Sequence, residues 1–139
     1  MPMRSRCDLN NRKGRVTRKS RETQLSARID LDGRGRAEVS TGLAFVDHML
    51  EQVARFGGFD MRLRGAGDVQ VDPHHLVEDA GIVLGQALSQ ALGVRDGIAR
   101  FASAHAPLDE SLARVVIDLG QRPFLSYNVP LRGRIGTHA

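Results

Sequence analysis

Residues 71–93 read VDPHHLVEDAGIVLGQALSQALG and carry the clearest secondary-structure signal in the chain. Asp72 is a favourable N-cap, and Pro73 suits the first helical position, where its missing N–H is not needed. The apolar residues that follow recur at spacings of three and four, and Gly93 supplies a stop signal. The stretch therefore predicts an amphipathic helix from Pro73 to Leu92 whose apolar positions are Leu76, Val77, Ala80, Val83, Leu84, Ala87, Leu88 and Ala91.

Two adjacent histidines fall in the first turn of this predicted helix. Glu78 is four residues after His74 and three after His75, so the three side chains can meet at one end of one helix face. Imidazole and carboxylate groups together suit ions such as manganese, iron, nickel or zinc. A chance pair of solvated histidines explains the same stretch equally well, so the rest of the chain must decide between a metal site and a plain helix terminus.

The flanking segments alternate between strand and helix patterns. TQLSARIDL at 23–31 alternates as a strand, DGRG at 32–35 is a hairpin turn signal, and RAEVS at 36–40 returns as a second strand. Residues 41–58 predict a helix with Leu43, Val46, Leu50 and Val53 on one face and a stop at Gly57 and Gly58.

Further strands are expected before and after the helix at 73–92. They are a third strand at 59–67, a short fourth strand at 67–71, two strands at 98–106 and 112–119, and a continuation or further strand at 123–129. This order predicts an α+β, two-layer sandwich: a mixed or antiparallel sheet with helices on one face. The last strands are expected to pair with each other and to expose apolar surface, which favours association.

Composition and charge limit the classes of function that the chain can have. The chain has 139 residues with 41% hydrophobic content, which fits one globular domain, and its single cysteine suits a reducing cytoplasm. No run predicts a membrane span or a signal peptide, so we expect a cytoplasmic protein without a membrane partner. Residues 1–20 hold most of the positive excess and predict a mobile basic arm, and an aromatic content of 4% disfavours a nucleic-acid surface.

Four other polar residues are candidates for a site. His48 lies on the predicted helix at 41–58, Glu22 begins the strand at 23–31, and Arg100 and Arg122 flank the later strands. Two guanidinium groups that converge would suit a phosphate, which accepts bidentate contacts. The alternative for His48 is a surface histidine on its helix, and each arginine alone is most often a solvated or ion-paired residue.

Six segments, taken in order, resemble imidazoleglycerol-phosphate dehydratase of histidine biosynthesis. They are RKSRET, TGLAFVDHML, GDVQVDPHHLVEDAGIVLGQAL, ALGVRDGIARF, APLDESLARVVIDL and RPFLSYNV. The resemblance implies a hydro-lyase that converts imidazole glycerol phosphate to imidazole acetol phosphate. It also implies two manganese ions in each site, and a homo-oligomer that forms a closed shell of twenty-four subunits.

The resemblance also assigns roles residue by residue. His48, His74, His75 and Glu78 match metal ligands, and Glu22, His48, His75 and Glu78 match catalytic positions, with Glu22 moving a proton. The substrate contacts matched by resemblance are Glu22, His48, Gln52, Phe56, His74, Glu78, Arg100 and Arg122, the two arginines on the phosphate.

Two departures from the family pattern shape the remaining expectations. Phe56 stands where the family usually has a histidine, and no second HHxxE-type segment follows residue 98, where His105 and His138 match no ligand position. We therefore expect residues 21–97 to form a first half-domain and residues 98–139 the first strands of an incomplete second half. Two functions remain open: the dehydratase, or a metal-binding or assembly remnant of that family that is close to inactive alone.

Overall fold

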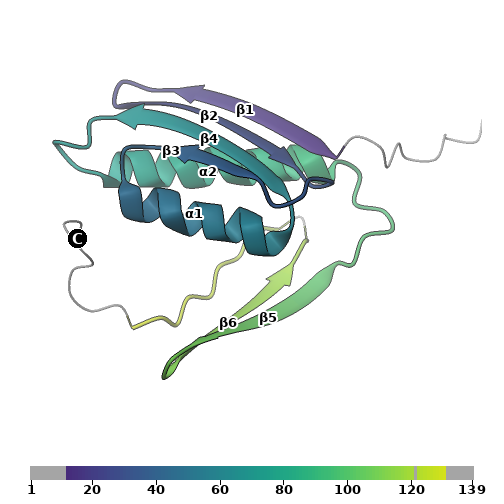
Figure 1. Ribbon diagram of the computed structural model, residues 1–139. Helices are drawn as coiled ribbons and strands as arrows, with labels where there is room; N and C mark the ends of the chain where they lie inside the picture. Colours follow the sequence, from purple (N-terminus) through teal and green to yellow (C-terminus); the bar gives the residue numbers. More distant parts are fainter. Residues whose placement is uncertain (1–11, 121, 131–139) are drawn as a thin grey trace, which may run out of the picture. The chain divides into compact units, whose positions relative to one another are not determined.

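The computed structural model describes residues 12–120 and 122–130, which fall into two units that divide between Val94 and Arg95 (Figure 1). The described elements of the first unit are strands β1 (Lys13–Lys19), β2 (Thr23–Asp30), β3 (Ala37–Ser40) and β4 (Asp60–Gly67), and helices α1 (Ala44–Gly57) and α2 (His74–Leu92). Those of the second unit are the strands β5 (Phe101–Leu108) and β6 (Ser111–Asp118). The boundary predicted from the sequence lies between residues 97 and 98.

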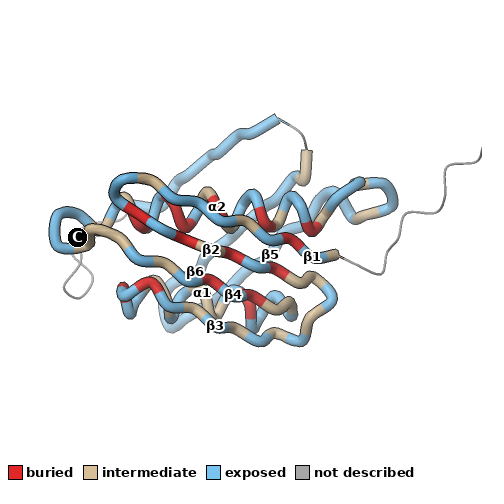
Figure 2. Tube along the Cα trace, turned by 90° about the horizontal axis from the view of Figure 1, so that it is seen from above, coloured by how far each residue is buried: buried red, intermediate tan, exposed pale blue. Residues whose placement is uncertain are grey.

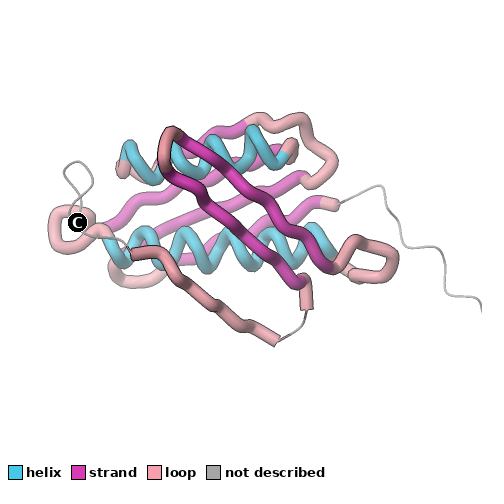
Figure 3. The backbone as a smooth tube through the Cα atoms, turned by 90° about the horizontal axis from the view of Figure 1, so that it is seen from below, coloured by secondary structure: helices cyan, strands magenta, loops and turns pink. Residues whose placement is uncertain are grey.

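The first unit is a two-layer structure with a mixed sheet. The strand order is β1-β2-β4-β3, in which β2 is antiparallel to both β1 and β4, and β3 is parallel to β4. Both helices lie on the same face of this sheet, as Figures 1 and 3 show. The α+β class, the mixed sheet and the single helical layer expected from the sequence are thereby confirmed.

The hydrophobic core is formed by buried residues of the sheet and of the helices, drawn in red in Figure 2. Leu25, Ala27 and Ile29 alternate along β2 as the sequence predicted, and Leu63 packs beside them from β4. Helix α2 contributes Leu76, Ala80, Val83, Ala87 and Ala91, all buried. Two predictions of core residues are wrong, because Val53 of α1 is 54% exposed and Val77 of α2 is 43% exposed. The buried residue of α1 is Ala54.

The predicted hairpin around residues 32–35 is wrong. Strand β3 does not return beside β2 but pairs in parallel with β4. The Asp60 carboxylate explains the detour, because its Oδ1 accepts hydrogen bonds from the backbone N–H groups of Arg34 (2.7 Å) and Arg36 (2.9 Å). These two bonds hold the connection against the start of β4 and guide β3 to the far edge of that strand.

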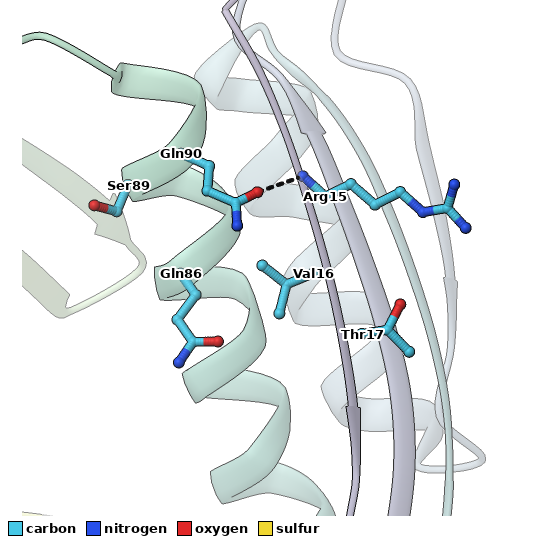
Figure 4. A pocket seen from close by; sticks show the side chains of 6 residues that line it. All are labelled: Arg15, Val16, Thr17, Gln86, Ser89 and Gln90. Atoms are coloured by element: carbon cyan, nitrogen blue, oxygen red, sulfur yellow. Dashed lines mark hydrogen bonds between the residues drawn. The ribbon is translucent and has the colours of Figure 1, made fainter.

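Part of the predicted basic arm is a strand. Lys13–Lys19 pair with β2 along their whole length as β1, an edge strand whose charged side chains tolerate solvent. Helix α2 also contacts this edge: the Gln90 Oε1 accepts a hydrogen bond from the Arg15 N–H at 3.0 Å, in a hollow of about 550 Å³ (Figure 4). The rest of the arm, residues 1–11, lies outside the described residues.

Two further strand predictions are wrong. Residues 68–72 form a turn, in which the Asp68 carbonyl accepts hydrogen bonds from the N–H groups of Val71 (2.7 Å) and Asp72 (3.2 Å). Residues 122–130 contain no strand in the described chain.

The strands expected at 98–106 and 112–119 do form, as β5 and β6, and they pair with each other. Their apolar residues Val115, Val116 and Ile117 are 48–71% exposed, as expected. In the described part of the chain, no helix is both long and apolar enough to span a bilayer.

The contact between β1 and α2 depends on Gly14. A Cβ at this position would lie 1.9 Å from the Ala87 carbonyl oxygen and 3.0 Å from the Ala91 nitrogen, so any side chain forces the strand and helix apart. We expect Gly14→Ala to lower the free energy of unfolding by about 1–3 kcal/mol, measured by urea denaturation.

Gly85→Ala is the matched control. Gly85 lies on α2, the helix that Gly14 contacts, and nothing lies within 4 Å of its added Cβ. This substitution should raise stability by about 0.5–1 kcal/mol through the better helix propensity of alanine. Equal effects of the two substitutions would contradict the close strand–helix approach.

Candidate functional site

The sheet topology brings three connections to one end of the first unit. The start of β2 pairs with the end of β4 (Thr23 with Gly67), so the β1–β2 turn lies beside the β4–α2 turn. Because β3 runs parallel to β4, its end at Ser40 leads into α1 at that same end. The first turns of both helices therefore lie at this end (Figure 1), which carries Glu22, His48 and the histidine pair.

His75 is held by a carboxylate that sequence reasoning did not find. Its Nδ1 lies 3.1 and 3.2 Å from the two Asp68 carboxylate oxygens, which suits an Nδ1–H that donates to Asp68; in the neutral form of that tautomer Nε2 carries the lone pair. The hydrogen bond to Asp68 raises the pKa of His75, and the charges of Asp68, Glu22 and Asp72 raise it further. The seven-residue spacing of Asp68 and His75 gave no helical signal because a turn separates them.

His74 has its own aspartate. Its Nδ1 lies 3.2 Å from the Asp72 Oδ1, which also accepts a hydrogen bond from the His74 backbone N–H at 2.8 Å. That backbone hydrogen bond lowers the pKa of Asp72. The two imidazole rings are neighbours, with centroids 4.3 Å apart and planes inclined by 52°. Each histidine therefore presents Nδ1 to a carboxylate. Asp72 was predicted as the N-cap of this helix; the N-cap position is instead Pro73, and Asp72 accepts the His74 N–H from one residue earlier.

Glu22 lies in the turn just before β2 rather than in the strand itself. The Ser20 hydroxyl donates to its Oε2 at 3.1 Å, and its backbone carbonyl accepts from the Asp68 N–H at 3.1 Å. The carboxylate is close enough to His75 to favour the protonated imidazole. An acid and a histidine that are distant in the sequence therefore lie close enough to interact electrostatically.

Asp79 anchors the start of α2 to the sheet and was also missed by the sequence analysis. The Thr23 hydroxyl donates to its Oδ2, and the Arg18 Nε donates to its Oδ1 at 2.6 Å. These bonds, the one from Thr23 foremost, lower the pKa of Asp79, although burial opposes the effect. Asp79 follows His75 by four residues, so the helical spacing already placed the two on one face.

The remaining residues predicted for the site within the first unit are exposed or half-buried. His48 and Phe56 of α1 and Glu78 of α2 are exposed, with Phe56 at 83%, and Gln52 is half-buried. Among residues 12–120 and 122–130, no three His, Cys, Asp or Glu side chains are placed to hold one metal ion. The structure thus joins His74 to His75 but does not gather His48 and Glu78 with them in one cluster, because the four donors come from two helices and different turns.

The two predicted phosphate contacts belong to the second unit. Arg100 forms a bidentate pair with Asp118, with Nε–Oδ1 2.7 Å and Nη2–Oδ2 3.1 Å, and its guanidinium lies 5.0 Å from the centroid of the Phe101 ring. The bond from Arg100 lowers the pKa of Asp118. Arg122 is exposed. His105 is exposed on β5, while His138 lies outside the described residues.

Comparison with known proteins gives one consistent family. Residues 41–139 match the family described as imidazoleglycerol-phosphate dehydratase. The imidazoleglycerol-phosphate dehydratase of Aromatoleum aromaticum is 53% identical over 127 residues, and that of Burkholderia mallei is 52% identical, in each case over 91% of this chain. The chain spans 65% of the length of these two relatives.

Solved structures agree with the sequence relatives. The chain is similar to the crystal structure of the dehydratase from Staphylococcus aureus, with a TM-score of 0.76 and 33% identity over 91% of this chain and 69% of that one. It is also similar to the enzyme from Pyrococcus furiosus, with a TM-score of 0.72 and 33% identity over 86% of this chain and 62% of that one.

The Asp79 anchor makes a testable contribution to stability. We expect Asp79→Asn to lower the free energy of unfolding at neutral pH by about 2 kcal/mol, because it weakens charge-assisted hydrogen bonds to a buried carboxylate. The folded-state pKa of Asp79 is depressed, so its contribution is present above the unfolded value near 3.9 and is lost as the pH falls through the folded value.

Urea denaturation at neutral pH and at pH about 3 measures both effects, and the difference between wild type and variant should shrink in acid. Asp32→Asn is the control, since its pair with Arg12 is solvent-exposed on both sides and a smaller loss is expected. A loss from Asp79→Asn no larger than that of the control would contradict the anchoring role.

Proposed function

Because the chain belongs to the imidazoleglycerol-phosphate dehydratase family, we propose that it dehydrates imidazole glycerol phosphate to imidazole acetol phosphate in histidine biosynthesis. The observation that carries the proposal is the pairing of His74 and His75 with their own aspartates beside Glu22. Paired imidazoles with an adjacent acid suit a reaction that binds an imidazole substrate and moves a proton on it.

The donor chemistry fits a divalent cation such as Mn²⁺. Metal-binding histidines usually donate one ring N–H to a carboxylate, which fixes the tautomer, and Asp68 and Asp72 stand in that relation to His75 and His74. We propose His48, His74, His75 and Glu78 as donors. Since no three described donors of one chain cluster, the ligand sets would draw on more than one copy of the chain. The bound ions would supply Lewis acidity to the substrate imidazole.

The other residues of the site have separable tasks. Glu22 is the proposed proton carrier, with its carboxylate oriented by the Ser20 hydroxyl. Gln52 can offer an amide to the substrate, whereas Phe56 can offer only apolar contact. Arg100 and Arg122 are the proposed phosphate contacts, and a phosphate at Arg100 would have to compete with its present partner Asp118.

Assembly into a homo-oligomer in the cytoplasm completes the proposal. Helix α1 presents an exposed apolar stripe on the side away from the sheet, at positions Phe45, Met49, Val53 and Phe56, each 40–83% exposed. Exposed apolar surface of this kind is typical of an interface. Assembly would also bring the metal donors of different copies within reach of one another.

One observation favours a second candidate function. No three donors converge among the described residues, so a chain that binds a metal weakly without turnover would have the same local geometry. Weakly held ions misplace the reacting groups, and a displacement of about 1 Å already costs on the order of 100-fold in rate. Turnover is the measurement that separates the two functions.

The central experiment measures formation of imidazole acetol phosphate by the purified chain with saturating Mn²⁺. We expect low but Mn²⁺-dependent turnover. Glu22→Gln should reduce it by at least about 100-fold, because general acid–base groups contribute that much. His105→Ala should leave it unchanged, since that exposed histidine lies on β5 outside the proposed donor set. No turnover by the wild-type chain would reject the dehydratase proposal and favour the metal-binding function.

The Asp68 contact predicts a metal-affinity effect that is independent of turnover. We expect Asp68→Asn to weaken Mn²⁺ binding by about 10–100-fold, because His75 loses the carboxylate that fixes its tautomer. Calorimetric titration of the metal measures this effect. Asp109→Asn in the β5–β6 turn is the control for a loss of one negative charge. Equal affinities for the wild-type and Asp68→Asn proteins would show that Asp68 does not orient a ligand.

A further inference from the structure

The face of the first-unit sheet opposite the helices carries a pattern that the dehydratase function does not use. Alternate residues of every strand point to this face, because their neighbours in the chain are buried against α1 and α2. Neither helix covers it, as Figures 1 and 2 show. Apart from Ala66, its residues are polar or charged, and most of them are exposed.

Three arginines form a row across this face. In the strand register Arg15 pairs with Arg28, and Arg28 pairs with Arg62, so the three lie on adjacent strands about 4.8 Å apart. Figure 4 shows the Arg15 side chain extending away from α2, toward this face. Like charges placed directly opposite each other destabilise a sheet, so the row is held at a cost to folding.

Three carboxylates, Glu38, Asp30 and Asp60, lie on this face, and each already has partners: Asp30 pairs with Lys13 at 3.0 Å, and Asp60 accepts hydrogen bonds from the Arg34 and Arg36 backbone N–H groups. Arg62 pairs with Glu38 at 2.7 Å, and among the described residues no salt bridge involves Arg15, Arg28 or the neighbouring Arg64. Arg64 acts on Glu38 only through its charge, without a bond to it. The guanidinium groups of Arg15, Arg28 and Arg64 are therefore available to bind an anion from solution.

A second row beside the arginines supplies neutral donors. Thr17, Ser26, Arg64 and Ser40 occupy successive strands at one register level and place three hydroxyls beside one guanidinium. They line a shallow hollow of about 660 Å³ together with the outward residues Gln24 and Ala66. Hydroxyl and guanidinium groups in adjacent rows are suitable donors for the oxygens of a phosphate group.

We propose that this sheet face is a binding site for a small anion with several negative charges, of the pyrophosphate class. Two rows of donors on neighbouring strands suit two linked phosphate groups better than a single one. A second copy of the same face is disfavoured, because two arginine rows would repel each other. Single-stranded nucleic acid is disfavoured as well, since none of the outward residues of β1, β2, β4 and β3 is an aromatic on which a base could stack.

The test is a calorimetric titration of the full chain, without added metal, with inorganic pyrophosphate, inorganic phosphate and a random single-stranded oligonucleotide. We expect pyrophosphate to bind more tightly than phosphate, and Arg28→Gln to weaken its binding about tenfold through loss of a charge-assisted contact. Arg55→Gln, which removes the same charge from an exposed position of α1, should leave the affinity within about twofold.

Thermal unfolding separates this site from a structural role. Arg28→Gln should raise the midpoint temperature of unfolding slightly, because it relieves the repulsion between the arginines of the row. The same substitution should lower the affinity for the anion. The proposal is overturned by unchanged pyrophosphate affinity in Arg28→Gln, by equal losses in Arg28→Gln and Arg55→Gln, or by binding of the oligonucleotide alone. None of these outcomes bears on dehydratase activity, because Arg28 is not part of the histidine site.

Discussion

The buried carboxylate of Asp79 is the point at which helix and sheet are joined at the functional end of the first unit. It accepts hydrogen bonds from Thr23 at the start of β2 and from Arg18 near the end of β1. A buried charge is tolerated only when it is paired, and these two donors satisfy that condition. Because Asp79 lies one helical turn after His75, the bonds that fix it also fix the direction in which α2 presents its histidines.

A second constraint is the position of strand β4 between two strands that run in opposite directions, β2 and β3. Its antiparallel pairing with β2 brings the β1–β2 turn to its end, and its parallel pairing with β3 brings the start of α1 to the same place. One strand therefore brings together the side chains of three separate connections. The register between β2 and β4 also sets Arg28 opposite Arg62, so the histidine site and the basic face share this register.

Local patterns in the sequence were enough to predict both helices, the alternation of β2 and the histidine pair. Helix α2 ends at Leu92 as its apolar spacing and Gly93 indicated. Pairing between distant segments was not predictable, because the turn signal at 32–35 contains no information about Asp60, which redirects β3. Strand β1 was hidden by its own charge: basic residues on its outward face resembled a solvated arm. Asp68 and Asp79 were missed because their partners are set by tertiary contacts.

Asp68 shows how closely the candidate ligand and the candidate acid are connected. Its carboxylate holds His75, while its backbone N–H donates to the carbonyl of Glu22. A displacement of the 68–72 turn would move the imidazole and the turn that carries Glu22 together, so their relative placement is kept even though both are accessible to solvent. These contacts exist in the protein alone, so less ordering remains to be done when a ligand binds, and part of the cost of binding is removed in advance.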